Sequence, residues 1–260
     1  MRSFRRLILT VSLLLGGCGE LDQEGTVLML VPGYRAELIA NERDGITSPD
    51  GLLWSDGTLY VADEGGSAVR AWRLDGSVRT LADRRAGLAS PEDLVRDPQG
   101  TIYASDDSGG GVWGIGPDGL TRLLPAGPTE GLALPPSGLI LAGDAEQHQI
   151  LRLDPAGAAT SYPGVKIDKP ESFAFDGLGN LYIADNRANI LYLLTRDGRL
   201  HRPISERGGF SPESLSYRGG VLHITDSANG KLFRYTPEEG LVTVALFGGK
   251  LANVQGVTSD

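Results

Sequence analysis

KPESFAFDGLGNLYIADNRANILYLLTRDGRLHRPISERGGF, residues 169–210, decides the fold of this chain. It contains four short segments of alternating apolar and polar character: SFAF, LYIAD, NILYLL and RLHRPI. Between them lie turn sequences rich in glycine, asparagine and aspartate, such as DGLGN at 176–180 and DG at 197–198. This alternation between turn signals predicts four short β-strands joined by tight turns.

The same unit is repeated along the chain at intervals of 38 to 42 residues. The five copies open on an acidic residue of the first strand, and a sixth opening has a glutamine: Asp50, Glu92, Glu130, Glu171, Glu213 and Gln255. A second acidic residue closes the second strand 13 or 14 residues later: Asp63, Asp106, Asp144, Asp185 and Asp226. Four short strands in a repeat of this length are typical of a propeller blade, so we expect an all-β, six-bladed β-propeller.

The sixth blade is expected to be shared between the two ends of the chain. Residues 26–40, TVLMLVPGYRAELIA, match the strand–turn–strand layout of residues 68–82, AVRAWRLDGSVRTLA. They would supply the third and fourth strands of a blade whose first strand lies near Val254. Five full repeats and one shared blade would close the ring and remove the sheet edges that template aggregation.

The last blade lacks its second strand, because the sequence stops at Asp260 inside what would be the first hairpin turn. Two explanations remain open: the sequence is a truncated product, or the last blade has three strands with the N-terminal hairpin moved inward. A missing inner strand would leave unpaired backbone groups beside the channel, and buried groups of that kind are costly.

Residues 1–17 have the features of a targeting segment. Arg2, Arg5 and Arg6 precede the apolar run LILTVSLLL, and LGGC then ends at Cys18. This arrangement resembles a bacterial lipoprotein signal, and the resemblance implies cleavage before Cys18 and acylation of its thiol. The alternative is an ordinary signal peptide with an incidental cysteine.

The lipoprotein interpretation divides the chain into a signal peptide (1–17), a lipidated cysteine with a linker (18–25) and a propeller (26–260). Gly19 is not the aspartate that retains lipoproteins in the inner membrane, which points to the outer membrane. We therefore expect a protein of the bacterial cell envelope, held by a lipid anchor.

Composition narrows the possible partners of the chain. The formal net charge of −9 argues against a general nucleic-acid-binding surface, and the single cysteine excludes an intrachain disulfide. We expect a monomer that binds a small molecule or a protein and no nucleic acid.

Two acidic rings are expected at one face of the disc. The start of the first strand and the end of the second lie at the same face, because these strands are antiparallel. An inner ring at the channel mouth would hold Asp50, Glu92, Glu130, Glu171 and Glu213, and a second ring farther out would hold Asp63, Asp106, Asp144, Asp185 and Asp226. Such a negative funnel attracts cations, and Ca²⁺, which takes 6–8 oxygen ligands, is a candidate cofactor.

The two rings call for different interpretations. The aspartates that end the second strands are read as structural, with side chains that accept backbone N–H bonds in the next loop. The inner ring is either a metal or ligand site or a structural feature encoded by the repeat. Like charges around one axis need a cation, arginines such as Arg187, or raised pKa values to compensate them.

Three histidines are the other candidates for acid–base chemistry. His148 lies in a loop at the acidic face and is the only one placed to act as a catalytic base. His223 occupies a slot filled by tyrosine in three other repeats and is expected to pack between blades. His201 is expected to be solvated at the outer rim.

The repeats resemble the six-bladed propeller superfamily of NHL-repeat, SMP-30/gluconolactonase and strictosidine-synthase-like proteins. The residues that show this are PESFAFDGLGNLYIAD with NILYLLTRDG, and SPDGLLWSDGTLYVADEGGSAVRAWRLDGSVRTLA. Similarity to the SMP-30 group would imply a channel Ca²⁺ held by a Glu, an Asp and asparagines at the blade openings. That metal polarises a lactone or ester for attack by water.

Two functions of different classes follow from these observations. The first is an envelope-anchored, non-catalytic lipoprotein whose acidic channel face binds a ligand, a cation or a protein partner. The alternative is a Ca-dependent hydrolase of lactones or esters of the SMP-30/gluconolactonase type. Enzymes break repeat symmetry at their site, and the near-uniform inner ring therefore favours the first.

Overall fold

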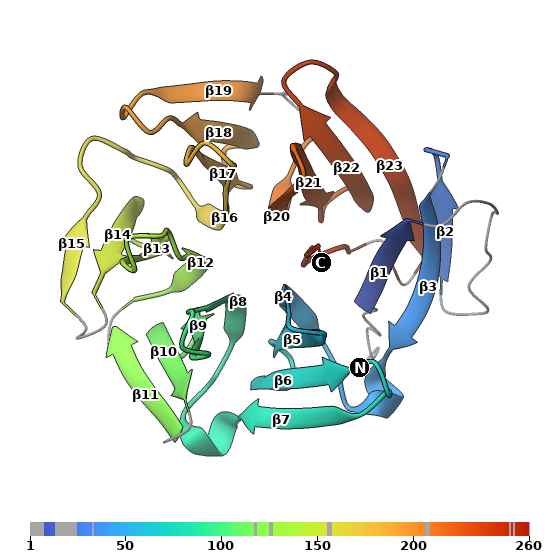
Figure 1. The fold of residues 1–260 in the computed structure, drawn as a ribbon, viewed down its shortest axis with the longest axis horizontal. Helices are drawn as coiled ribbons and strands as arrows, with labels where there is room; N and C mark the ends of the chain where they lie inside the picture. The colour runs from blue at the N-terminus through green and yellow to red at the C-terminus, as the bar shows by residue number, and fades with distance from the viewer. Residues whose placement is uncertain are drawn as a thin grey trace.

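The computed structural model describes residues 8–13, 25–32, 34–116, 119–124, 127–154, 158–205, 209–249, 251 and 253–259. These residues form a disc of β-sheets arranged around a central axis (Figure 1). The chain is an all-β propeller, which confirms the fold predicted from the repeat.

Five blades each contain four consecutive antiparallel strands. Blade one holds β4 (Pro49–Ser55), β5 (Thr58–Asp63), β6 (Ala68–Arg73) and β7 (Val78–Ala82), and blade two holds β8 (Pro91–Arg96), β9 (Ile102–Asp106), β10 (Gly111–Gly116) and β11 (Gly119–Leu124). Blade three holds β12 (Thr129–Ala133), β13 (Ile140–Asp144), β14 (Gln149–Leu153) and β15 (Ala159–Ser161). Blade four holds β16 (Pro170–Phe175), β17 (Leu181–Asp185), β18 (Ile190–Leu194) and β19 (Leu200–Ser205), and blade five holds β20 (Pro212–Arg218), β21 (Val221–Asp226), β22 (Lys231–Thr236) and β23 (Gly240–Gly249). Short 3₁₀ turns at Glu42–Asp44 and Arg84–Ala86 precede blades one and two.

The hydrophobic core is divided among the seams between blades. One cluster joins Ile150 of blade three to Phe173 and Ile183 of blade four. The next joins Leu191 of blade four to Leu222 of blade five, and similar clusters fill the seams between blades one, two and three. Both faces of each sheet are therefore buried, which explains the apolar character of the inner strands.

Both ends of the chain contribute to the sixth sector, as predicted. Strand β1 (Ile8–Leu13) pairs with β3 (Tyr34–Ala40), and residues 253–259 run beside the axis between β20 and β4 (Figure 1). Thr258 Oγ1 accepts a 3.0 Å bond from Trp54 N, and Val257 N donates a 3.1 Å bond to Ser214 Oγ. Residues 253–259 thus occupy the innermost position expected for the segment near Val254, and no described strand forms a ladder with them.

The prediction that residues 26–40 form a paired hairpin of the sixth blade was wrong. Strand β2 (Gly25–Met29) leaves β3 and becomes the fifth, outermost strand of blade five, with Val27 opposite Phe247 and Met29 opposite Ala245. The reason is that the ten-residue strand β23 presents a free outer edge, on the side away from β22, and β2 pairs with its residues 245–249. Val27 and Met29 pack there against Val244.

Strand β1 comes from the segment interpreted as a signal peptide, so the full chain uses residues 8–13 in its fold. Cleavage before Cys18, which would remove β1 from its pairing with β3, stays a prediction, since Cys18 lies outside the described residues. No helix in the described part of the chain is long and apolar enough to span a membrane.

A ring of contacts at the residue after each opening position holds the blades together. Its members are either glycines, which allow backbone to approach, or polar side chains that accept a hydrogen bond: Gly51, Asp93, Gly131, Ser172, Ser214 and Gly256. A Cβ on Gly51 would lie 2.2 Å from Glu92 O of the next blade, and one on Gly256 would lie 2.0 Å from Asp50 O. The last of these contacts joins the sixth sector to blade one and completes the circle.

Candidate functional site: the acidic channel mouth

The inner acidic ring stands on a backbone irregularity that occurs in all five blades. In every first strand the register shifts between the residue before the acid and the residue one or two positions after it. A β-bulge of this kind bends the strand locally and redirects a side chain. The repeat therefore uses the bulge to turn one carboxylate per blade out of the sheet.

The structure brings the five inner-ring carboxylates to one pocket. Its lining comprises Asp50, Glu92, Glu130, Glu171 and Glu213, together with Gly51, Asp93, Ser172 and Ser214 of the contact ring. The space that these side chains leave is about 10 Å³, close to the room that one water molecule needs. Among the described residues, no group of three or more carboxylate, imidazole or thiol side chains stands close enough together to hold a metal ion.

Lys169 provides a positive charge inside this ring, and sequence reasoning missed it. Its Nζ lies 3.3 Å from Glu130 Oε1 and 2.9 Å from Glu171 Oε2. Burial lowers the pKa of Lys169, but the charges of Glu171 and Glu130 outweigh burial and hold it above its ordinary value. The amine is therefore an ammonium ion and not a nucleophile at neutral pH.

The repeat itself contained the signal for Lys169. The residue two positions before each inner acid is Ser48, Ser90, Pro128, Lys169 or Ser211, so one of the five slots holds a charged residue. A repeat position that holds a different type of residue in one copy is a position at which the blade structure does not require one particular residue.

Glu92, in β8 of blade two, has a different electrostatic setting from Glu130 and Glu171. Burial raises the pKa of Glu92 to about 11, and the charges of Asp50, Glu130, Glu64 and Asp107 act in the same direction. The charged groups that contribute most to this shift are all carboxylates. At neutral pH this side chain keeps its proton unless a cation comes close.

Burial also raises the pKa values of Glu130 and Glu171, and the ammonium group of Lys169 opposes that effect in both. Glu213 is held by neutral donors, because Asn186 Nδ2 lies 3.2 Å from Glu213 Oε2 and the Ser227 hydroxyl donates to the same oxygen. The ammonium group of the ring and the donors to Glu213 therefore come from blades four and five.

A third set of residues, absent from the sequence prediction, adds to the site. It consists of the residue directly after each aspartate that ends a second strand: Glu64, Asp107, Ala145, Asn186 and Ser227. Ser90 Oγ lies 3.5 Å from Glu64 Oε1 and 3.4 Å from Glu92 Oε1, which places Glu64 beside the inner ring. These five positions hold five residue types, and they break the symmetry that the inner ring keeps.

The second acidic ring makes mainly backbone contacts. Asp106 accepts bonds from the N–H groups of Ala89, Ser90 and Gly109 at 2.7–2.9 Å, and its side chain is fully buried. Asp63, Asp185 and Asp226 are buried in the same way and accept from equivalent loops, whereas the partly exposed Asp144 accepts from Gln147 N and the Gln149 side chain. In blades one, two and four these aspartates fix the loop that leads into the first strand, and Asp185 binds the N–H of Lys169 at 3.2 Å.

His148 has an unusual setting among the loop residues of the acidic face. It follows Asp144 by four positions, and the residues in this slot all have positive φ: Ser67, Gly110, His148, Asn189 and Gly230. Its Nδ1 lies 2.7 Å from Asp168 O and 3.1 Å from Asp168 Oδ1, while Arg187 Nη1 lies 3.5 Å from the same carboxylate. A left-handed backbone favours small residues, so the blade does not require a histidine here.

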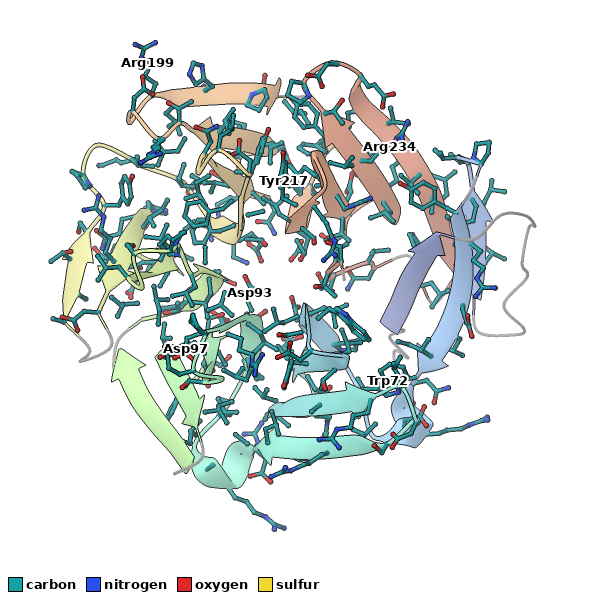
Figure 2. The ribbon with its side chains drawn as sticks, in the orientation of Figure 1. Trp72, Asp93, Asp97, Arg199, Tyr217 and Arg234 are labelled. Atoms are coloured by element: carbon teal, nitrogen blue, oxygen red, sulfur yellow. The ribbon has the colours of Figure 1, made fainter. Side chains whose placement is uncertain are left out.

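The other two histidines are differently placed. Burial and the charge of Arg234 lower the pKa of His223, which keeps it neutral. His201 is exposed on the outer strand β19. Arg199, two residues earlier in the sequence, lies at the rim of the disc (Figure 2).

Asp93 is a further carboxylate that sequence reasoning did not identify. It belongs to β8 and lies near the central axis of the disc (Figure 2). Its carboxylate accepts a 2.9 Å bond from Leu132 N of β12 in the next blade. Burial raises the pKa of Asp93 to about 6, and the backbone bonds from Leu132 and Leu94 limit the rise. The equivalent acceptors in blades four and five are Ser172 and Ser214.

Comparisons with known proteins support the propeller and a local family similarity. Residues 77–111, from β7 to the start of β10, match the family model described as strictosidine synthase-like, N-terminal. No curated protein sequence matches the chain. This short match agrees with one branch of the resemblance noted in the sequence.

Solved structures match over more of the chain. A chain of the nidogen/laminin complex is 18% identical with a TM-score of 0.73, and the match covers 86% of this chain and 88% of that one. Virginiamycin B lyase from Staphylococcus aureus is 17% identical (TM-score 0.62; 76% and 69% covered), and a protein of unknown function from Bacteroides thetaiotaomicron is 14% identical (TM-score 0.65; 97% and 71% covered). At these identities the likeness extends to the fold alone.

Proposed function

We propose that this chain is an envelope-anchored propeller lipoprotein that binds a cation, or a ligand presented together with a cation, at its acidic channel mouth. The observation that carries this proposal is Glu92, a carboxyl whose pKa is raised to about 11 by burial and by the charges of four neighbouring carboxylates. A cation at this position would replace the proton of Glu92 and relieve the mutual repulsion.

The dimensions of the site favour a monatomic cation as the first occupant. The space within the ring is about 10 Å³, so an organic ligand would have to remain above it. Glu92, Asp50, Glu64 and Asp107 are the groups that would hold Ca²⁺, whose coordination is flexible and uses oxygen ligands. The ion would have to draw them together, because they do not form a ready cage.

Anchoring is the second part of the proposal. The arginines before an apolar run and the LGGC sequence that ends at Cys18 support acylation of that cysteine. A lipid anchor on an acidic propeller would present the channel face to ligands or protein partners in the cell envelope, and Gly19 favours the outer membrane.

Calorimetric titration of Ca²⁺ into the protein tests the cation site. We expect one saturable site, release of about one proton per ion at neutral pH, and an affinity that rises with pH, because Glu92 must ionise. The proton count follows from titrations in two buffers with different ionisation enthalpies.

The Glu92→Gln variant should lose the proton release and weaken binding roughly tenfold or more. Glu146→Gln is the matched control, since Glu146 is exposed on a blade-three loop of the same face. Absence of binding, with a melting temperature unchanged by Ca²⁺ or EDTA, would refute the cation site and direct attention to protein partners.

The contact between His148 and Asp168 favours a second candidate function, hydrolysis of lactones or esters. The Asp168 carbonyl holds Nδ1 of His148 as a donor, which leaves Nε2 as the basic nitrogen. A Ca-dependent hydrolase would need such a base to take a proton from water. His148→Asn, which copies Asn189 in the equivalent left-handed slot, should abolish hydrolysis of δ-lactones or p-nitrophenyl acetate without unfolding the loop. Equal rates in the variant and the native chain would exclude His148 as that base.

A further inference from the structure

The outermost strand of blade five, β2, leaves an apolar surface exposed. Leu28 and Leu30 alternate with the inward-facing Val27 and Met29, and they are 50% and 46% exposed. Leu28 stands directly opposite Leu246 of β23, which extends the apolar surface by one strand. We refer to Leu28, Leu30 and Leu246 as the β2 face.

Other outer strands are protected in ways that β2 is not. Strand β19 is charged and contains a proline, with Arg202 and Pro203 both exposed, and β7 presents the exposed Arg79. Strand β15 has only three residues. Charges, proline and shortness are the usual means by which an edge strand avoids pairing with other chains. Residues 25–33, GTVLMLVPG, contain no charged residue in a chain where 22% of residues are charged.

The position of β2 in the sequence indicates what covers its face. Gly25 is seven residues after Cys18, and a chain of that length reaches about 25 Å at most. The first structured surface after the predicted anchor is therefore the one that exposes leucines and no charge. An uncharged apolar strand meets an anionic lipid surface without the repulsion that the rest of this acidic chain would experience.

We propose that the β2 face rests on the lipid surface to which Cys18 anchors the protein, an inference that depends on the anchoring part of the proposed function. Leu28 and Leu30 enter the boundary between headgroups and acyl chains, and the free edge of this five-residue strand stays in the hydrated headgroup layer. The contact fixes the orientation of the disc relative to the membrane, so the disc does not rotate freely about its lipid anchor.

Site-directed fluorescence on the protein expressed from the full-length sequence and lipidated at Cys18 tests this orientation. The chain is produced in a bacterial host, so that Cys18 is processed there, with one added cysteine at a time: Leu28→Cys, Leu30→Cys or Leu178→Cys. Each variant is labelled with an environment-sensitive probe and reconstituted in phosphatidylethanolamine–phosphatidylglycerol vesicles that contain brominated acyl chains. Leu178 is the matched control, because it is 77% exposed on a hairpin turn of blade four.

We expect blue-shifted emission and at least roughly twofold stronger quenching at positions 28 and 30 than at 178. Equal quenching at the three positions would overturn the proposal. A blue shift at position 28 that grows with protein concentration in lipid-free detergent solution would also overturn it, and would assign the face to a second copy of the chain.

The mass of the N-terminal peptide separates this inference from the proposal beneath it. An acylated Cys18 with equal quenching at all positions refutes only the β2 contact. A chain without acylation overturns the anchor and, with it, the inference.

Discussion

At the scale of the single residue, Lys169 shows how one repeat differs from the other four at an aligned position for an electrostatic reason. The ammonium group lies between two carboxylates whose pKa values burial has raised, and it stands where three other blades have serine. It removes part of the repulsion that the repeat creates when it points one acid per blade at the same axis.

Replacement of Lys169 by serine should therefore destabilise the protein in a pH-dependent way. Without the ammonium group, Glu130 and Glu171 hold their protons to higher pH, and carboxyls with raised pKa values stabilise the fold at low pH and lose that contribution as pH rises. At about pH 8 we expect the unfolding free energy to fall by up to about 3 kcal/mol. This is the lower end of the range for a broken buried ion pair, because the Lys169 side chain is one-quarter exposed. The loss should be smaller at about pH 5. Urea unfolding at both values measures it.

Lys166→Ser is the control for this experiment, because Lys166 is exposed in the preceding loop. A loss of equal size at the two pH values would show that Lys169 contributes through packing and not through its charge.

Asp93 offers a second test at this scale. Its folded pKa of about 6 lies above the ordinary value of 3.8, so its contribution to stability is complete below about pH 4 and disappears as pH rises through about 6. Asp93→Ser, which copies Ser172 and Ser214, keeps an acceptor for Leu132 N and removes the titration. Plotted against pH, the unfolding free energies of the two proteins should converge or cross between about pH 4 and 6. Their slopes should differ by up to the amount that corresponds to one bound proton. Parallel curves would rule out titration of Asp93 in this range.

At the scale of the element, the aspartate at the end of each second strand holds together the loops that position the site. Asp185 accepts from the N–H groups of Asp168, Lys169 and Ala188 while fully buried. Because each N–H left without a partner costs about 1 kcal/mol or more, Asp185→Ala should lose roughly 3 kcal/mol of stability. Asp144→Ala should lose only about 1 kcal/mol, since Asp144 is partly exposed and accepts one backbone N–H. Denaturant unfolding of both variants checks the order, and an equal loss would contradict the capping role.

The elements also show what the sequence could and could not predict. Strand periodicity and turn residues were sufficient for five blades and for the position of the inner acids, because these depend on local alternation. The partner of β2 could not be deduced, because it depends on which outer edge is free once the blades have packed, and both β2 and β3 have the alternation of outer strands. The bulges at the blade openings were invisible for a similar reason, since one extra residue does not disturb the repeat length.

The candidate site was predicted only in its repeated part. The acids common to all five repeats stand out when the repeats are aligned, whereas Lys169, Glu64 and Asp107 occupy positions at which the repeats differ. Asp168 could not be paired with His148 from sequence, because the two residues belong to neighbouring blades and their contact exists only after the blades pack.

At the scale of the whole molecule, stability depends on a circle of contacts whose last member is Gly256. Gly256→Ala would place a Cβ 2.0 Å from Asp50 O and push the sixth sector away from blade one. Overpacking costs about 1–3 kcal/mol, and the melting temperature should fall by roughly 5 °C, with faster proteolysis of the segment after Leu251. Gly177→Ala is the control, because a Cβ there would meet no atom within 4 Å. Equal melting temperatures would mean that the seam between the sixth sector and blade one does not support the ring.

The same seam has a consequence for how the protein reaches its native state. Trp54 and Thr258 are 204 residues apart in the sequence, yet their hydrogen bond joins neighbouring strands. Each blade can form from local hairpins as it leaves the ribosome, but the circle cannot close until residues 253–259 have been synthesised, and bringing such distant segments together is entropically slow. Until then the side of blade one that faces the sixth sector is uncovered. Closure is therefore the step at which a chaperone or a secretion machine has the longest time to act.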